Sequence, residues 1–304
     1  MYAPRLATVF LAFFSLTAVC LAEEPTFQRS LTVNGALALN VCSRSGSIHV
    51  SGTDGSKVQI SATLHKSTWH ATGTAGDIKS IVANPPIKQV GNSIEIGTDD
   101  TCSGPTAPNV EIDYEITVPK NSSVVAISGP GAIHMEGIGG FVHIATSSGN
   151  IAVNGIGPDS KIGTRSGTID IQGAHGPLMA LTGSGALSIR DSDVTEARLH
   201  TTSGDITTMG LRGGIRINSG TGNLNIGGLP TSDWKLETGS GSIQVHVAAN
   251  AKFTLDAETG SGTIDSTLPA PLSGHIANGV LKGPVNGGGP TVQLYSGSGN
   301  IIFD

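Results

Sequence analysis

A short motif, Ser-Gly-x-Ile, recurs along most of the chain and constrains its fold more than any other feature. Four successive copies are Ser148–Ile151, Ser166–Ile169, Ser184–Leu187 and Ser203–Ile206. Further copies centre on Gly46, Gly131, Gly222, Gly241, Gly262 and Gly299. A fixed period of about 18 to 21 residues is typical of a chain that coils and stacks its repeats on one another.

The residues around each motif glycine alternate in a way that predicts two strands per repeat. Two and four residues after the glycine most side chains are apolar, as at Ile169 and Ile171, and a residue that is mostly polar or small, such as Asp170, stands between them. The positions seven and five before the glycine are also apolar, as at Leu178 and Ala180. Alternation with period two predicts half-buried strands.

The alternation changes phase at the motif glycine, so we expect the chain to turn there. Glycine tolerates the positive φ that such a corner requires. A second glycine often follows six residues later and predicts the next corner; examples are Gly137, Gly155, Gly173 and Gly210.

These patterns predict an all-β protein, a single-stranded parallel β-solenoid with coils of about 18 to 21 residues. The chain has 43 glycines and only 4% aromatic residues, which suits a narrow core of Ile, Val and Leu. We expect one domain over residues 23–304, with irregular first coils and insertions over 23–120 and regular repeats over 121–304. No helix is expected after residue 22.

The irregular part contains longer alternating segments, which predict strands at Lys57–His65, Ser93–Ile96 and Val110–Pro119. Ser67–Pro86 is interpreted as an insertion with a short irregular element, and Asp99–Pro108 as a loop. The outer face of the third strand begins with three acidic residues. We interpret them as a solvated face or a protected edge, with a calcium site as the alternative.

The N-terminal residues have the pattern of a secretory signal peptide. Met1–Arg5 carries one positive charge, Leu6–Leu21 is apolar, and small residues precede a cleavage site after Ala22. A lipoprotein signal would use Cys20, but the preceding valine fits that signal poorly. We therefore expect residues 1–22 to be removed, no membrane span after cleavage, and a periplasmic, secreted or cell-surface location.

The charge of the chain narrows the possible partners. The chain has 17 Lys and Arg against 23 Asp and Glu, with a net charge of −6 and no basic stripe. Nucleic acid is therefore not an expected partner.

Cys42 and Cys102 remain after signal cleavage, and an even pair in an oxidising compartment predicts a disulfide. Two separate buried thiols are the alternative.

Hydroxyl side chains recur three residues and one residue before the motif glycine, as at Thr182 and Ser184. They could form a flat outer surface that orders water or sugar hydroxyls. They could instead satisfy backbone groups at the corners. Both columns lie an odd number of residues before the glycine, as do the inward apolar positions seven and five before it. We therefore expect both columns to face the interior.

The only ionisable cluster that the alignment produces lies four residues before the glycine, at His200, Asn218, Glu237 and Glu258. If the two carboxylates are one rung apart, they repel unless a cation or a proton intervenes. We therefore hypothesise a weak cation-binding or sugar-binding strip, with an ordinary hydrated face as the alternative. No catalytic residue, cofactor or other metal site is predicted.

Two histidines, His49 and His134, share an offset from their motif glycines. Their coils are far apart in the sequence, so we do not expect a metal-binding pair.

The order of elements resembles the bacterial putative-adhesin family of β-strand-repeat proteins, a domain of unknown function. The matching segments are Phe27–Val33, Ser45–Gly52 and Tyr114–Lys120, followed by the run of Ser-Gly-x-Ile copies. The resemblance covers nearly the whole chain after the signal peptide. It implies a β-repeat fold and supplies no catalytic residues.

From these observations we expect an exported, non-catalytic scaffold that binds a protein or glycan partner. One alternative is a polysaccharide lyase or hydrolase built on a β-helix. Another is a self-assembling envelope element, because the chain ends on an apolar motif, Gly299–Asp304, with no polar cap after it. Unpaired strand edges at an open solenoid end can stack end to end.

Overall fold

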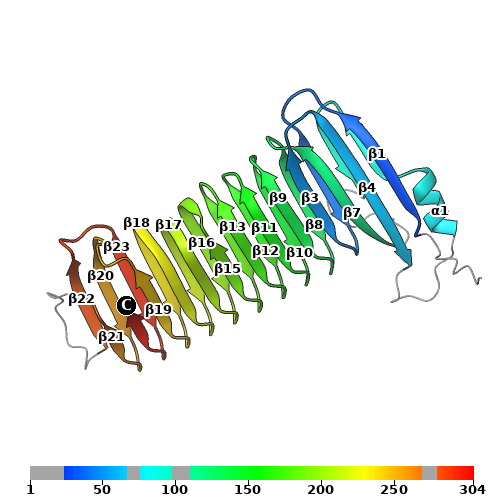
Figure 1. The fold of residues 1–304 in the computed structure, drawn as a ribbon. Coiled ribbons are helices and arrows are strands. Elements are labelled where there is room, and N and C mark those ends of the chain that lie inside the picture. Colours follow the sequence, from blue (N-terminus) through cyan, green and yellow to red (C-terminus); the bar gives the residue numbers. More distant parts are fainter. Residues whose placement is uncertain (1–23, 67–75, 98–109, 269–278) are drawn as a thin grey trace, which may run out of the picture.

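The computed structural model describes residues 24–66, 76–97, 110–268 and 279–304. The protein is an elongated row of strands, with β1 and α1 at one end and β22 at the other (Figure 1). All 24 strands of these residues belong to one sheet. The all-β prediction is therefore confirmed.

The N-terminal region contains seven strands and one short helix. Their bounds are β1 Thr26–Thr32, β2 Ala38–Ser43, β3 Ile48–Thr53, β4 Lys57–Lys66, α1 Gly76–Ala83, β5 Ile87–Val90, β6 Ser93–Ile96 and β7 Val110–Pro119. The helix was not expected from the sequence. It is anchored by Ile78, which is 7% exposed and belongs to the hydrophobic core.

The repeat region contains the remaining strands. The first of them are β8 Ser123–Ser128, β9 Ile133–Ile138, β10 Val142–Thr146, β11 Ile151–Ile156, β12 Ser160–Thr164, β13 Ile169–Ala174, β14 Leu178–Thr182, β15 Leu187–Arg190 and β16 Asp193–Thr201. Those that follow are β17 Ile206–Ser219, β18 Leu224–Thr238, β19 Ile243–Val247, β20 Phe253–Thr259, β21 Ile264–Ser266, β22 Val280–Val285, β23 Thr291–Ser296 and β24 Ile301–Phe303.

Each coil contributes one strand before its motif glycine and one after it, so the sheet consists of two ladders. The first ladder runs β5-β6-β2-β8-β10-β12-β14-β16-β17-β18-β23-β20-β22. The second runs β1-β4-β7-β3-β9-β11-β13-β15-β17-β18-β19-β24-β21. The long strands β17 and β18 take part in both ladders and join them.

Successive coils pair in parallel and in register, so equivalent residues lie on top of one another. Ile144 pairs with Ile162, and Ile162 pairs with Ala180. Antiparallel pairs occur only towards the ends, in β1–β4, β4–β7, β5–β6 and β20–β22. The sheet is therefore mixed, and the expectation of parallel pairing throughout is wrong. Among these pairs, β5 and β6 form a hairpin, with Val90 paired with Ser93, and the others join strands that are distant in the sequence.

The first and last coils of the chain both lie inside the stack. The coil of β2 and β3 lies between that of β6 and β7 and that of β8 and β9. At the other end, β23 lies between β18 and β20, as the red strand between yellow and orange shows in Figure 1. Likewise β24 lies between β19 and β21. The expectation that Gly299–Asp304 forms an open end is therefore wrong.

The core is the narrow space between the two ladders. It is lined by the inward residues of each strand, most of them Ile, Val and Leu. Larger side chains fill it near the C-terminal end, where Phe253 and Phe303 stack with ring centroids 5.7 Å apart. Trp234 is 1% exposed, and its indole nitrogen donates a hydrogen bond to the Gly213 carbonyl at 2.7 Å.

Glycine is required at the motif corner mainly by close approach of the stacked backbones. A Cβ added at Gly185 would lie 1.8 Å from the carbonyl oxygen of Gly167, one coil below. Among the motif glycines, only Gly46 has a positive φ. The expected positive φ occurs instead at the second corner, where Gly155 and Gly173 have φ of 64° and 66°.

Candidate binding surface

The predicted column of ionisable residues lies on the outer face of the first ladder, but a fifth residue interrupts it. His200 pairs with Asn218 and Asn218 with Glu237, as expected. Glu237 then pairs with Tyr295, and Tyr295 pairs with Glu258. The expectation that the two carboxylates are one rung apart is wrong, because β23 inserts between their strands.

A second outward row runs beside this column, two residues earlier in each strand. Together the two rows form a surface that we call the binding strip, because alternation along each strand points these side chains away from the core. Its residues are Arg198, His200, Arg216, Asn218, Lys235, Glu237, Gln293, Tyr295, Asp256 and Glu258.

At one end of the binding strip a single carboxylate holds two arginines. Glu196 accepts hydrogen bonds from Arg198 at 2.8 Å and from Arg216 at 2.5 Å. The hydrogen bond from Arg216, followed by that from Arg198, lowers the pKa of Glu196 below its usual value. The carboxylate therefore stays ionised and keeps the two guanidinium groups in fixed positions.

At the other end, lysines pair with acids on the same face. Lys235 lies 2.9 Å from Glu237, and Lys282 of β22 lies 2.8 Å from Asp256. The hydrogen bond with Asp256 raises the pKa of Lys282. Counting Glu196 and Lys282 with the strip, four cationic side chains face four carboxylates, so this surface attracts neither polyanions nor polycations strongly.

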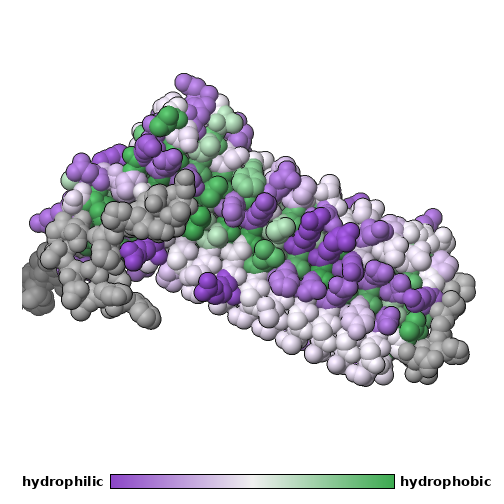
Figure 2. Space-filling view, turned by 180° about the vertical axis from the view of Figure 1, so that it is seen from behind, coloured by the Kyte–Doolittle hydropathy of each residue, from purple (hydrophilic) through white to green (hydrophobic). Residues whose placement is uncertain are grey.

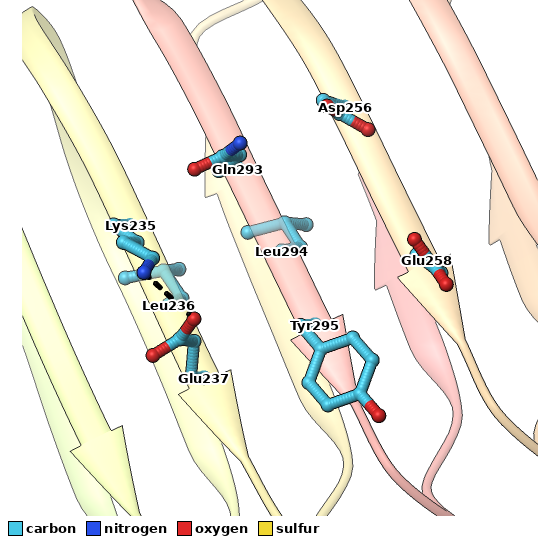
Figure 3. A pocket seen from close by; sticks show the side chains of 8 residues that line it. All are labelled: Lys235, Leu236, Glu237, Asp256, Glu258, Gln293, Leu294 and Tyr295. Carbon is cyan, nitrogen blue, oxygen red and sulfur yellow. Dashed lines mark ion pairs between the residues drawn. The ribbon is translucent and has the colours of Figure 1, made fainter.

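Two shallow depressions lie along the binding strip. One, of about 480 Å³, is bordered by Met179, Leu181, His200, Arg216 and Asn218, among others. The second, of about 230 Å³, surrounds Tyr295 and is shown in Figure 3. Lys235 and Glu237 line both depressions, so the two adjoin each other.

Tyr295 is the residue of the predicted column that the sequence interpretation missed; the row beside the column was not predicted either. Its side chain is 45% exposed, which is unusual for an aromatic residue in so regular a sheet. It stands four residues before Gly299, the same offset as Glu237 from Gly241. This offset from the glycine is enough to place Tyr295 in the column. Its position between Glu237 and Glu258 could not be predicted, because it depends on β23 lying between β18 and β20.

The two hydroxyl columns have different environments. The column three residues before the glycine faces the interior, as predicted: Thr182 accepts a hydrogen bond from the Gly185 amide and donates one to the Gly167 carbonyl. The column one residue before it, including Ser184, is mostly exposed, so that part of the prediction is wrong. The chain already turns at this position, so the alternation along the strand no longer determines which way the side chain points. A weakly polar strip follows the lower edge of Figure 2, as expected for a corner of Gly, Ser and Thr.

The two histidines are neighbours, although their coils are far apart in the sequence. Because the first coil lies inside the stack, His49 pairs with His134, and their ring centroids are 4.7 Å apart. His49 Nδ1 lies 3.3 Å from Glu115 Oε1. In the part of the chain that the structure describes, no group of three or more His, Cys, Asp or Glu side chains is arranged to hold a metal ion.

The acids on the outer face of β7 contact neighbouring strands. Asp113 accepts hydrogen bonds from the amide and hydroxyl groups of Ser47 and lies 3.1 Å from His65. Glu115 contacts His49. These contacts agree with the interpretation of a structural, solvated face.

Several predictions concern residues outside the described ranges. The signal peptide, residues 1–22, is one, and Cys102 is another, so its disulfide with Cys42 stays a prediction. Cys42 itself is 8% exposed at the end of β2. No helix within the described ranges is long and apolar enough to cross a membrane.

Solved structures of low sequence identity match most of the chain. A putative lipid-binding protein from Parabacteroides distasonis is 12% identical, with a TM-score of 0.51, and the match covers 92% of this chain and 96% of that one. A putative adhesin from Bacteroides fragilis is 16% identical, with a TM-score of 0.42 and coverage of 92% and 97%. A putative adhesin from Parabacteroides distasonis is 12% identical, with a TM-score of 0.43 and coverage of 93% and 98%.

No curated protein matches the chain. The sequence profile of the Toastrack DUF4097 family matches residues 111–302, which is most of the chain and includes all the regular coils. The resemblance inferred from the strand repeats is thereby confirmed. The chain belongs to the Toastrack DUF4097 family.

Proposed function

We propose that the protein is an exported, non-catalytic scaffold that binds a protein or glycan partner through the binding strip. The observation that carries this proposal is the fixed position of its outward side chains on an in-register ladder. Arg198 and Arg216 are held by one carboxylate, and Lys235 is held by Glu237. Side chains that are already positioned lose little conformational entropy when a partner binds.

The shape of the surface supports binding along the strip. The two adjoining depressions follow the column from His200 to Glu258, and the larger one is bordered by the apolar side chains of Met179 and Leu181. Leu181 is 41% exposed. Apolar contacts beside oriented polar groups are the usual composition of a protein or glycan recognition site.

The test uses the chain from Glu23 onward in a screen against glycans and cell-envelope proteins. The variant His200→Ala/Arg216→Ala/Asn218→Ala removes three exposed side chains of the strip. The matched control, Ser188→Ala/Thr207→Ala/Asn225→Ala, makes the same number of changes on the outer face of the second ladder at the same level of the stack. We expect the strip variant to lose the partner and the control to retain it. Equal binding by both variants would refute the proposed surface.

A polysaccharide-degrading enzyme is the first alternative. A hydrolase of this kind usually uses two carboxylates that flank the bond to be cleaved. In the strip, Glu237 is engaged by Lys235 and Asp256 by Lys282. Incubation with uronic-acid and neutral polymers distinguishes the two functions, because release of shorter or unsaturated products would establish catalysis.

Self-assembly is the second alternative, and the strands that cover the last coil argue against stacking through it. The last coil is covered by β20, β21 and β22, and the terminal strand of the second ladder, β21, has only three residues. Short edge strands offer little backbone for pairing with another copy. We expect a monomer in sedimentation at high concentration. A concentration-dependent series of larger species would favour assembly.

A further inference from the structure

Tyr295 lies at the centre of a patch of six outward side chains that come from three neighbouring strands. Glu237 and Glu258 lie on either side of it in one row, and Lys235, Gln293 and Asp256 form the row beside it. Figure 3 shows the tyrosine ring between the two glutamates, with Gln293 two residues earlier on the same strand. The spacing between strands, about 4.8 Å, sets the distance between neighbours.

Three polar groups in this patch have no hydrogen bond and no ion pair within 4 Å among the described residues: the Tyr295 hydroxyl, the Gln293 amide and the Glu258 carboxylate. The charge of Lys282 attracts Glu258 without direct contact. The other charged groups are paired, Lys235 with Glu237 and Asp256 with Lys282. The unpaired groups all border the depression of about 230 Å³. They are therefore free to contact a ligand without breaking an existing interaction.

The chemistry of these groups matches a sugar ring. An aromatic face carries partial negative charge and attracts the C–H groups on the flat side of a pyranose. A carboxylate accepts hydrogen bonds from hydroxyl groups, and an amide both donates and accepts them. The depression is smaller than the pockets of about 300 Å³ or more that hold drug-sized ligands, which suits a single ring of a larger glycan.

The charge of the patch selects among possible ligands. Glu237, Asp256 and Glu258 outnumber Lys235 and Lys282, so an anionic polymer is repelled slightly. A flat protein partner would bury about 800 Å² and would need contacts well beyond this patch. A neutral sugar needs only the aromatic face and the three unpaired polar groups.

We propose that Tyr295 is the platform of a subsite for a neutral pyranose unit, with Glu258 and Gln293 as hydrogen-bonding partners of its hydroxyl groups. This inference rests on the proposed function, because it gives the chemical class of the glycan that the binding strip recognises. It assigns Tyr295 to ligand contact and Glu237 to holding Lys235 away from the ring.

The chain provides a sensitive probe of this subsite. After removal of the signal peptide only two tyrosines remain, Tyr114 and Tyr295, and Tyr114 is 2% exposed. Ring-¹³C-labelled tyrosine therefore gives signals from one buried and one exposed ring. Neutral oligosaccharides of glucose, mannose, galactose and N-acetylglucosamine are titrated to millimolar concentration. We expect the Tyr295 signals to shift with at least one of them and the Tyr114 signals to stay unchanged.

Variants show whether the sugar stacks on the Tyr295 ring or binds the surface non-specifically. Tyr295→Phe keeps the ring and should bind within a few-fold of the unaltered chain. Tyr295→Ala should weaken binding by about tenfold or more, and Glu258→Gln should weaken it less because the amide still accepts hydrogen bonds. Asn225→Ala, on the second ladder, is the control and should have no effect.

The outcomes are separable from those of the proposed function. The inference is overturned if no neutral sugar shifts Tyr295 while the Tyr114 signals show a folded protein. It is also overturned if Tyr295→Ala binds the sugar as well as the unaltered chain does. A third outcome is that the triple strip variant loses binding of an envelope protein while no sugar shifts the Tyr295 signals. In that case the proposed function stands and the sugar subsite is refuted.

Discussion

Tyr295 lies beside Glu237 in the first ladder, although the chain builds a further coil and the antiparallel edge strand β22 before it returns to form β23. Asp233 fixes the start of the returning strand, because its carboxylate accepts a hydrogen bond from the Thr291 amide at 2.8 Å. Asn286 holds the turn before it by donating to the carbonyls of Ala249 and Ala251. The last coil is thus an interior element, and this places an aromatic ring between two glutamates.

The interior position of the last coil predicts a large effect of Phe303→Ala. Phe303 is fully buried and stacks on Phe253, so its truncation should lower the free energy of unfolding by about 3 to 5 kcal/mol. Ile302, the preceding residue, is 37% exposed, and Ile302→Ala should cost less than about 1 kcal/mol. Urea unfolding of both variants measures the difference. Equally small effects would mean that the C-terminal coil is a loosely attached end.

The close stacking of the corners predicts opposite results for two glycine substitutions. Gly185→Ala brings a Cβ within 1.8 Å of the Gly167 carbonyl oxygen, so the stacked coils must separate. We expect a loss of more than about 3 kcal/mol in the free energy of unfolding. At Gly163, in a strand, the nearest atom would be 3.8 Å away, and Gly163→Ala should be neutral or slightly stabilising. Similar losses at the two sites would contradict the packing argument.

The two hydroxyl columns predict different costs for removing a hydroxyl group. Thr182→Val leaves the Gly185 amide and the Gly167 carbonyl without their partner and should cost about 1 to 3 kcal/mol. Ser184→Ala changes an exposed side chain and should lie within about 0.5 kcal/mol of the unaltered protein. Thermal unfolding compares them directly. A large cost at Ser184 would show that the exposed column is structural after all.

The buried hydroxyl of Tyr114 predicts a stabilising substitution. This group has no hydrogen-bond partner among the described residues, so Tyr114→Phe should raise the free energy of unfolding by about 1 kcal/mol. Burial raises the pKa of Tyr114, so the unfolded chain releases this proton first as the pH rises. Stability should therefore fall above about pH 10, the usual range of tyrosine. The Phe variant should lack this part of the alkaline loss. An identical pH dependence for the two proteins would contradict the assignment.

Alternation and the motif glycine were sufficient to predict the regular coils, because both depend on local sequence. The pairing of Ile144 with Ile162, one coil apart, follows from the repeat alone. The order of the end coils does not, since it is decided by which open edge a returning strand pairs with. For that reason the contacts of His49 with His134 and of Glu237 with Tyr295 could not be predicted. The outward direction of Ser184 was missed because alternation ends where the chain turns.

The most direct test of the account is oxidative footprinting of the protein with and without the partner found by the binding screen. Three exposed side chains report on different faces: Leu181 and Tyr295 on the first ladder, and Met209, 60% exposed, on β17 where it pairs in the second ladder. We predict that the partner protects Leu181, Tyr295 or both from oxidation and leaves Met209 as reactive as before. Protection of Met209, with Leu181 and Tyr295 unchanged, would contradict the assignment of the binding strip.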